Sequence, residues 1–292
     1  MGIYDRDYTR PAPRRSQPPG LTPVTKGLLV LNVLICVLDL FILPKLLGID
    51  TEIYPPPLTA WGAFTIRSAV FEGRIWEFLT FQFLHANLGH ILANGLGLFV
   101  FGPWMERWWG SARFLIFYLL CGVAGAAFYA FLVFTHVLND PYTVPLIGAS
   151  AGIYGILIGV AVVAPDLRVQ LLFPPIEMSI RHMAMIVLAI AVAVVIFNLE
   201  NAGGQAGHLG GAILGFILVK WPFLLGRGNA ASLHNQERRE SVAAKLRPRT
   251  TVDLAASTEI DRILDKISAQ GFQSLTDAER DALRNASDDS RP

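Results

Sequence analysis

GASAGIYGILIGVAVVA, residues 148–164, joins a Gly-x-Ser-x-Gly pentad to an apolar run that can enter a lipid bilayer. Ser150 stands at the start of that run, and further along the chain His208 stands at the start of another. Hydroxyl groups are common in membrane helices, where they pack and form hydrogen bonds, but ionisable side chains there are rare and mark functional sites. The two residues together indicate a nucleophile and a base at membrane depth.

The composition is that of a polytopic membrane protein. Of 292 residues, 53% are hydrophobic and only 16% are charged, and the mean hydropathy is positive, which is unusual for a soluble domain of this length. The sequence therefore predicts an all-α fold with six transmembrane helices. Its apolar runs lie at 27–47, 86–104, 112–134, 149–164, 182–198 and 208–225.

The distribution of positive charge predicts the topology. Arginine and lysine residues precede the first run and follow the last, while the connections 135–148 and 199–207 contain neither. By the positive-inside rule both termini are cytoplasmic. The long, late apolar run that begins near Leu28 does not fit a cleavable signal peptide. We expect an integral protein of a bacterial cytoplasmic (inner) membrane.

Four segments are expected along the chain. Residues 1–25 have the proline-rich, polar composition of a disordered arm, 26–228 form the membrane domain, 229–256 form a basic linker and 257–287 form a small cytoplasmic helical hairpin. Thr276 and Glu279 match a capping box at the start of the second hairpin helix. A solubilising tail that packs on nothing is the alternative. The basic linker is typical of a segment near lipid headgroups, and no element for reading nucleic acid is visible.

Topology also gathers the polar residues of the spans. If the amino terminus is inside, the second, fourth and sixth spans all start at the outer side. Polar residues from three helices then converge on one leaflet: His85, His90, Asn94, Ser150 and His208.

Each of these residue types has a chemical use. A serine hydroxyl is a weak nucleophile until a base such as a neutral imidazole removes its proton, which suits Ser150 and His208. Gly148 leaves room for a substrate backbone, and the free N–H groups at a helix start, with Asn94 and His90, can stabilise an oxyanion. Asn94 as a purely packing residue between helices is the alternative.

Other chemistry fits less well. The histidines lack the close spacing and the carboxylate that a zinc site normally has, so we expect no metal and no cofactor. The Gly-x-Ser-x-Gly pentad does not follow a strand, as the nucleophile elbow of soluble hydrolases does. Glycines at every fourth position, Gly207, Gly211 and Gly215, predict that the sixth helix presses against the fourth and brings His208 to Ser150.

With these residues identified, the chain resembles the rhomboid intramembrane serine proteases of bacterial type over about 75–228. The family's HxxxxHxxxN pattern is matched by His85, His90 and Asn94. Its serine motif is matched by 148–152, and its GHxxG helix by 207–211.

The resemblance implies a Ser150–His208 dyad without an acidic third member. It also implies an oxyanion site made by Asn94, His90 and the Ser150 amide, a Tyr154 ring stacked near His208, and a structural or water-retaining His85.

Two charged positions bear on the resemblance as well. Glu106-Arg107 resembles the family's charged pair at the cytoplasmic turn, whereas Trp76-Glu77 stands where the family usually has Trp-Arg. Any role of that arginine is therefore not carried over.

The predicted function is that of an endopeptidase. We expect cleavage of transmembrane or membrane-tethered proteins near the outer leaflet, through an acyl-enzyme on Ser150, with the lipid bilayer as the other partner. No nucleic acid is expected, and no oligomeric state is predicted. One alternative is a non-catalytic rhomboid-like protein that binds transmembrane clients. Another is a small transporter, which is disfavoured because the polar groups cluster at one end and no inverted repeat is seen.

Overall fold

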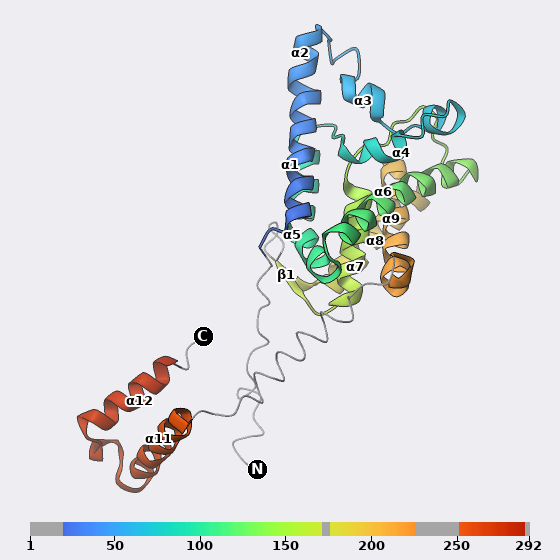
Figure 1. Cartoon of the computed structure of the whole chain (residues 1–292). Helices are drawn as coiled ribbons and strands as arrows, with labels where there is room; N and C mark the ends of the chain where they lie inside the picture. The colour runs from blue at the N-terminus through green and yellow to red at the C-terminus, as the bar shows by residue number, and fades with distance from the viewer. Residues whose placement is uncertain (1–19, 171–175, 226–250, 290–292) are drawn as a thin grey trace. The chain divides into compact units, whose positions relative to one another are not determined.

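The computed structural model describes residues 20–170, 176–225 and 251–289. It divides into two compact units, one up to Ala230 and one from Ala231. The first unit is a bundle of apolar helices joined by short elements (Figure 1). Its long helices are α1 (Pro23–Val37), continued by η3 (Leu38–Ile42) and α2 (Leu43–Leu47), then α5 (Leu88–Trp109), α6 (Ser111–Phe134), α7 (Ser150–Val163), α8 (Ile180–Ile196) and α9 (Ala202–Lys220).

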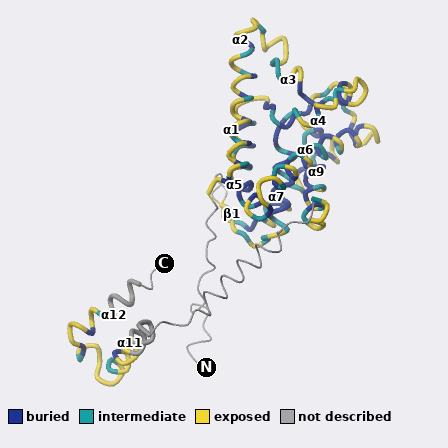
Figure 2. The backbone as a smooth tube through the Cα atoms, viewed as in Figure 1, coloured by how far each residue is buried: buried dark blue, intermediate teal, exposed yellow. Residues whose placement is uncertain are grey.

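The six predicted apolar runs all coincide with helices, but only four of these are long and apolar enough to cross a membrane. These four are Pro23–Leu47, α5, α6 and α9, whereas α7 and α8 are shorter apolar helices of 14 and 17 residues. Apolar side chains point outward as well as inward, and α1 shows a largely exposed outer face in Figure 2. An outer surface of this kind suits lipid rather than water.

The start of the last span was predicted too late. The expected run began at His208, but α9 already begins at Ala202 and ends at Lys220. The missed first six residues, Ala-Gly-Gly-Gln-Ala-Gly, are mostly small and of low hydropathy, and they form helix here because they pack against α6 and the loop that leads into α7. His208 is consequently held inside a helix and not at its frayed end.

Several short elements join the long helices. The connection from α2 to α5 contains α3 (Pro57–Gly62), η4 (Ile66–Phe71), α4 (Glu77–Thr80) and η5 (Phe81–Phe83), while η6 (Pro222–Leu225) follows α9. Between α7 and α8 a two-stranded antiparallel ladder pairs β1 (Arg168–Gln170) with β2 (Glu177–Ser179). Phe64 pairs with Leu146 through two backbone hydrogen bonds, so the first connection braces the segment that leads to Ser150.

Close helix approach in the centre depends on glycine. A Cβ at Gly215 would lie 2.6 Å from Gly155 Cα of α7, and one at Gly125 of α6 would lie 2.7 Å from Gly207 O of α9. A Cβ at Gly211 would overlap the carbonyl of Ala151, the residue after Ser150. The predicted contact between the last helix and the serine helix is confirmed, and it is possible because α9 has glycine at both points where it meets the α7 backbone.

Replacing Gly211 by Ala is expected to destabilise the bundle by about 1–3 kcal/mol, since the added methyl group would meet a backbone carbonyl that cannot move aside. Thermal unfolding of the full chain in detergent measures this. Gly27→Ala is the control, because a Cβ there meets nothing within 4 Å. Equal stability of the two variants would show that the helices can separate at little cost.

Glu77, the residue that departs from the family's Trp-Arg, is buried in the first connection. Its side chain is 1% exposed, accepts hydrogen bonds from Ser68 Oγ and Thr65 N, and pairs with Arg74 Nε at 3.2 Å. Arg74 also donates to Trp61 O at 2.6 Å and lies over the Trp76 ring, 5.4 Å from its centroid. In this chain the cation that joins the parts of the connection therefore comes from position 74.

Arg74→Ala is expected to cost about 2 kcal/mol, because it leaves the buried Glu77 carboxylate without its counter-ion; part of Arg74 is exposed, which keeps the cost below that of a fully buried pair. Adding Glu77→Gln should restore about half of the loss, since the stranded charge is then removed. Thermal unfolding of the two variants tests this. A double variant less stable than Arg74→Ala would mean that Glu77 is held by Ser68 and Thr65 alone.

The second unit consists of α11 (Thr251–Gln270), η7 (Phe272–Ser274) and α12 (Asp277–Asp289). The start of α11 lies inside the segment predicted to be linker, so that boundary was wrong; the rest of the linker, 229–250, lies outside the described residues. Gly271, at φ 79°, ends α11 as expected. The predicted capping box is present: Thr276 N donates to Glu279 Oε2 at 2.8 Å, and Glu279 N donates to Thr276 Oγ1 at 3.3 Å.

Glu279 also connects the two helices, because it accepts from Lys266 Nζ at 2.8 Å and from Arg262 at 2.8 Å. Lys266, the Thr276 amide and Arg262 together lower the pKa of Glu279 to about 2. A lowered folded-state pKa stabilises the pair of helices above the unfolded-state value of about 4.3, and this stabilisation is lost as the pH falls from there towards 2.

Glu279→Gln in the full chain is therefore expected to raise amide hydrogen exchange in 258–283 at pH 7, to the level that wild type reaches near pH 2 after correction for intrinsic rates. Glu259→Gln serves as the control, since Glu259 is exposed and contacts Arg262 on its own helix. If both variants exchange equally, Glu279 does not connect α11 to α12.

Candidate active site

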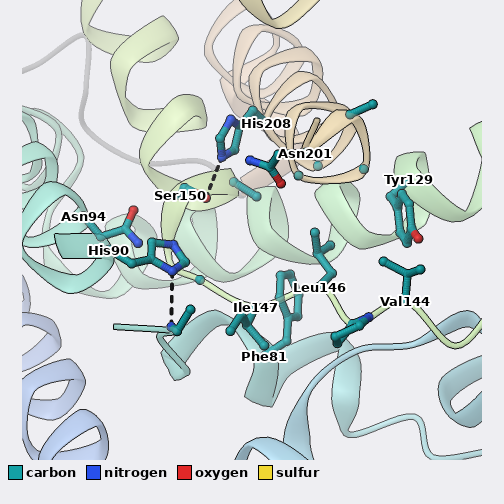
Figure 3. Close-up of a pocket in the computed structure, with 18 of the residues that line it drawn as sticks. Phe81, His90, Asn94, Tyr129, Val144, Leu146, Ile147, Ser150, Asn201 and His208 are labelled. Carbon is teal, nitrogen blue, oxygen red and sulfur yellow. Dashed lines mark hydrogen bonds between the residues drawn. The ribbon is translucent and has the colours of Figure 1, made fainter. Parts of the chain in front are cut away.

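A cavity of about 820 Å³ lies among α5, α6, α7 and α9 and the two loops that lead into α7 and α9 (Figure 3). It is lined by all but one of the predicted site residues, the exception being His85, which lies behind His90. Those on the cavity wall are His90, Asn94, Gly148, Ser150, Tyr154 and His208. The second, fourth and sixth predicted spans correspond to α5, α7 and α9, and these three helices meet at the cavity as expected.

Ser150 is the first residue of α7. The chain reaches it through Gly148, whose φ of 125° suits glycine and whose N–H donates to Phe81 O at 2.9 Å. A side chain at position 148 would also lie 2.7 Å from His90 Nε2. Glycine therefore allows both the turn and the approach of the imidazole. The first N–H groups of α7 have no acceptor within the helix.

His208 contacts Ser150 directly. Its Nε2 lies 2.7 Å from Ser150 Oγ, across 58 residues of sequence. Its ring stacks on Tyr154, one turn along α7 from the serine, with centroids 4.2 Å apart and planes 14° from parallel. The hydrogen bond and the stacking together fix both the position and the plane of the imidazole.

His90 and Asn94 present donors to the same space from α5. Asn87 caps α5 by accepting from His90 N at 2.9 Å, and Ala86 N donates to His90 Nδ1 at 3.4 Å. A ring whose Nδ1 accepts carries its proton on Nε2, the atom turned toward Gly148. Asn94 is 8% exposed, and its Nδ2 has no acceptor among the described residues. Both nitrogens lie close to Gly148, two residues before Ser150, because a Cβ at position 148 would be 2.7 Å from His90 Nε2 and 3.6 Å from Asn94 Nδ2.

His85 lies behind this site. It is buried and meets the His90 ring edge-on, with centroids 5.1 Å apart. Burial, with a smaller contribution from His90, lowers the pKa of His85 to about 4, so the ring is neutral at physiological pH. A neutral ring supports His90 without adding a charge.

Sequence reasoning missed Gln205. Its Oε1 lies 2.9 Å from His208 Nδ1, one turn earlier on the same helix. An i,i+3 relation to a candidate base is a visible signal, but it was hidden because the helix was expected to begin at His208. Within residues 20–170, 176–225 and 251–289, no three His, Cys, Asp or Glu side chains are placed to hold a metal ion.

Residues 72–224, just over half of the chain, match the family described as "Rhomboid domain". The chain belongs to the rhomboid family. Its apolar helices and this family membership make it an integral membrane protein. Residues 255–289, most of the α11–α12 unit, match a second family, which is described as a family of unknown function (DUF6576).

Among curated proteins, the chain is similar to rhomboid protease GluP of Bacillus subtilis (strain 168), with 34% identity over 159 residues, 54% of this chain and 28% of GluP. It is 28% identical to rhomboid protease AarA of Providencia stuartii over 160 residues, 50% of this chain and 55% of AarA. RHOMBOID-like protein 7 of Arabidopsis thaliana is 26% identical over 181 residues, 60% of this chain and 53% of that protein. The chain thus spans from about a quarter to about half of these relatives.

Proposed function

We propose that this chain is a serine endopeptidase that cleaves transmembrane or membrane-tethered proteins near the outer leaflet of the membrane. The observation that carries the proposal is the 2.7 Å contact between His208 Nε2 and Ser150 Oγ in a cavity inside an apolar bundle. The two relatives whose names include "protease" support the same reaction class.

In the first half of the reaction, His208 Nε2 takes the Ser150 proton while Oγ attacks the carbonyl carbon of the scissile bond. The carbonyl oxygen becomes an oxyanion, which His90 Nε2–H, Asn94 Nδ2–H and the Ser150 N–H stabilise. As the C–N bond breaks, His208 gives the proton to the leaving amine. An ester between Ser150 and the new carboxyl end remains.

In the second half, water enters through the cavity and His208 removes one of its protons. The hydroxide attacks the ester carbonyl, the same donors stabilise the second oxyanion, and His208 returns the proton to Ser150 Oγ as the ester breaks. The products are an amine end and a carboxylate end, and the protein is unchanged. Every proton passes through His208, so no metal or cofactor is needed.

We further propose that all six apolar helices cross the membrane with both termini in the cytoplasm of a bacterial cell. The 14 residues of α7 span only about 21 Å, less than the roughly 30 Å of a hydrocarbon core. If the cytoplasmic end of α7 is at the interface, Ser150 lies below the outer surface. The loops above it then keep a water-accessible cavity at that depth.

Ser150→Ala and His208→Ala are each expected to abolish cleavage of a model transmembrane substrate, and the double variant should be no worse than either, because the two residues act as one unit. Turnover in detergent measures cleavage, and a fluorophosphonate probe should label Ser150 in wild type only. Strictly additive losses, or wild-type labelling in Ser150→Ala, would contradict a shared mechanism.

Asn94→Ala is expected to lower kcat by about 10- to 1000-fold, the range for one lost oxyanion donor, with little change in KM. Asn94 Nδ2 has no acceptor to lose among the described residues, so the bundle should stay folded. Thermal unfolding of the same preparation is the control. An unchanged kcat in a folded variant would mean that Asn94 only packs between helices.

A further inference from the structure

The second ring nitrogen of the candidate base has a partner of its own. Gln205 Oε1 lies 2.9 Å from His208 Nδ1, and His208 Nε2 lies 2.7 Å from Ser150 Oγ. The first contact lies within α9, the second crosses from α9 to the start of α7 at the cavity wall, and the Tyr154 ring covers one face of the imidazole. Gln205, His208 and Ser150 therefore form a continuous row of hydrogen-bonding groups.

In this row, the role of each group as donor or acceptor follows from the chemistry. A neutral imidazole carries one proton, and Ser150 can give its proton only to an unprotonated Nε2, so the ring proton must be on Nδ1. The Gln205 side-chain oxygen then accepts that Nδ1–H. Without an acceptor, either nitrogen can hold the proton, and the tautomer with Nε2–H cannot act as the base.

We propose that Gln205 is a positioning residue for the reaction: its carbonyl oxygen holds His208 in the Nδ1–H tautomer, the place that an acidic residue takes in Ser-His-Asp sites of other folds. This inference rests on the proposed function. Gln205 touches neither substrate nor the reacting atoms and acts through His208 alone.

A neutral acceptor suits this location. A carboxylate in a mostly apolar bundle must be fully hydrogen-bonded to offset its desolvation, whereas an amide oxygen accepts the same proton without bringing a charge. The helix supplies the geometry, because side chains three residues apart lie on the same face. Gln205 N donates to Asn201 O at 3.1 Å, which anchors the first turn and the glutamine with it.

Three substitutions of similar length separate the roles that a side chain can play at position 205. Gln205→Glu offers an acceptor, Gln205→Met offers neither a good acceptor nor a donor, and Gln205→Lys offers only donors. Ile213→Met, an exposed change on the same helix, is the control. Each full-length protein is compared for kcat, KM and thermal unfolding in detergent.

We expect Gln205→Met to lower kcat by about 10- to 100-fold with KM within about threefold, because binding is intact but the base is often in the wrong tautomer; a locked wrong tautomer costs about 10⁴ in the best-studied serine site. Gln205→Lys should be slower still, and Gln205→Glu should stay within about tenfold of wild type. The ¹⁵N pattern of His208 in the full chain should show Nδ1–H in wild type and a mixture in Gln205→Met.

A folded Gln205→Met with wild-type kcat, or a Gln205→Glu as slow as Gln205→Met, would overturn the proposal. So would an unchanged His208 tautomer in Gln205→Met. The spectrum does not depend on turnover, so it tests Gln205 even if wild type cleaves nothing. Absence of cleavage and of Ser150 labelling in wild type would instead refute the proposed function.

Discussion

The site depends on how closely α9 and α7 approach each other. Ser150 and His208 can share a hydrogen bond only because Gly211 and Gly215 let the α9 backbone lie against Ala151 and Gly155 of α7. In lipid, helices gain little from hydrophobic burial against each other, so close van der Waals packing has to hold them together. The same glycines therefore provide both the stability of the bundle and the alignment of the reactive pair.

A second constraint is the cost of polar groups at this depth. Ser150, His208 and Gln205 satisfy one another in a row, whereas the Asn94 amide nitrogen is buried without an acceptor among the described residues. An orphaned donor is expensive in an apolar environment, and a structure tolerates it when a ligand supplies the acceptor. A developing oxyanion beside Ser150 is an acceptor of this kind. The free-energy cost of leaving the Asn94 donor unpaired in the resting protein is then offset when that donor binds the oxyanion.

Much of this could be predicted from the sequence, because it depends on periodicity and topology. The apolar runs gave the helices, the charge asymmetry placed the starts of three helices on one side, and the four-residue glycine spacing brought His208 to Ser150. The rest concerns two pairs of residues three positions apart, Gln205–His208 and Arg74–Glu77, whose spacing is visible in the sequence but whose contact depends on how the surrounding chain packs. Gln205 is inside α9 because small residues such as Gly203 pack there despite low hydropathy, and Arg74 supplies the cation for Glu77 through a turn that only the folded connection defines.

The support of α5, which carries His90 and Asn94, also lies outside the reach of sequence patterns. Near its last turn Glu106 accepts hydrogen bonds from Val24 N, Thr25 N and the hydroxyl of Ser111, with two more from threonine hydroxyls, so the start of α1 is tied to the end of α5. At the far end of the same first span, Asp39 accepts from Leu58 N at 2.7 Å and holds the start of α3.

Both carboxylates are buried, and a buried carboxylate is tolerable only when donors fill its lone pairs. If the segment that donates to one of these carboxylates moved, the carboxylate would lose its hydrogen bonds while still buried, so such movement is unfavourable. Because Glu106 lies on the same helix as His90 and Asn94, a shift of α1 at Thr25 would be carried along α5 to the donors of the proposed oxyanion site. The first span contributes no residue to the cavity wall. Held by these two carboxylates, it nevertheless supports the helix that carries His90 and Asn94.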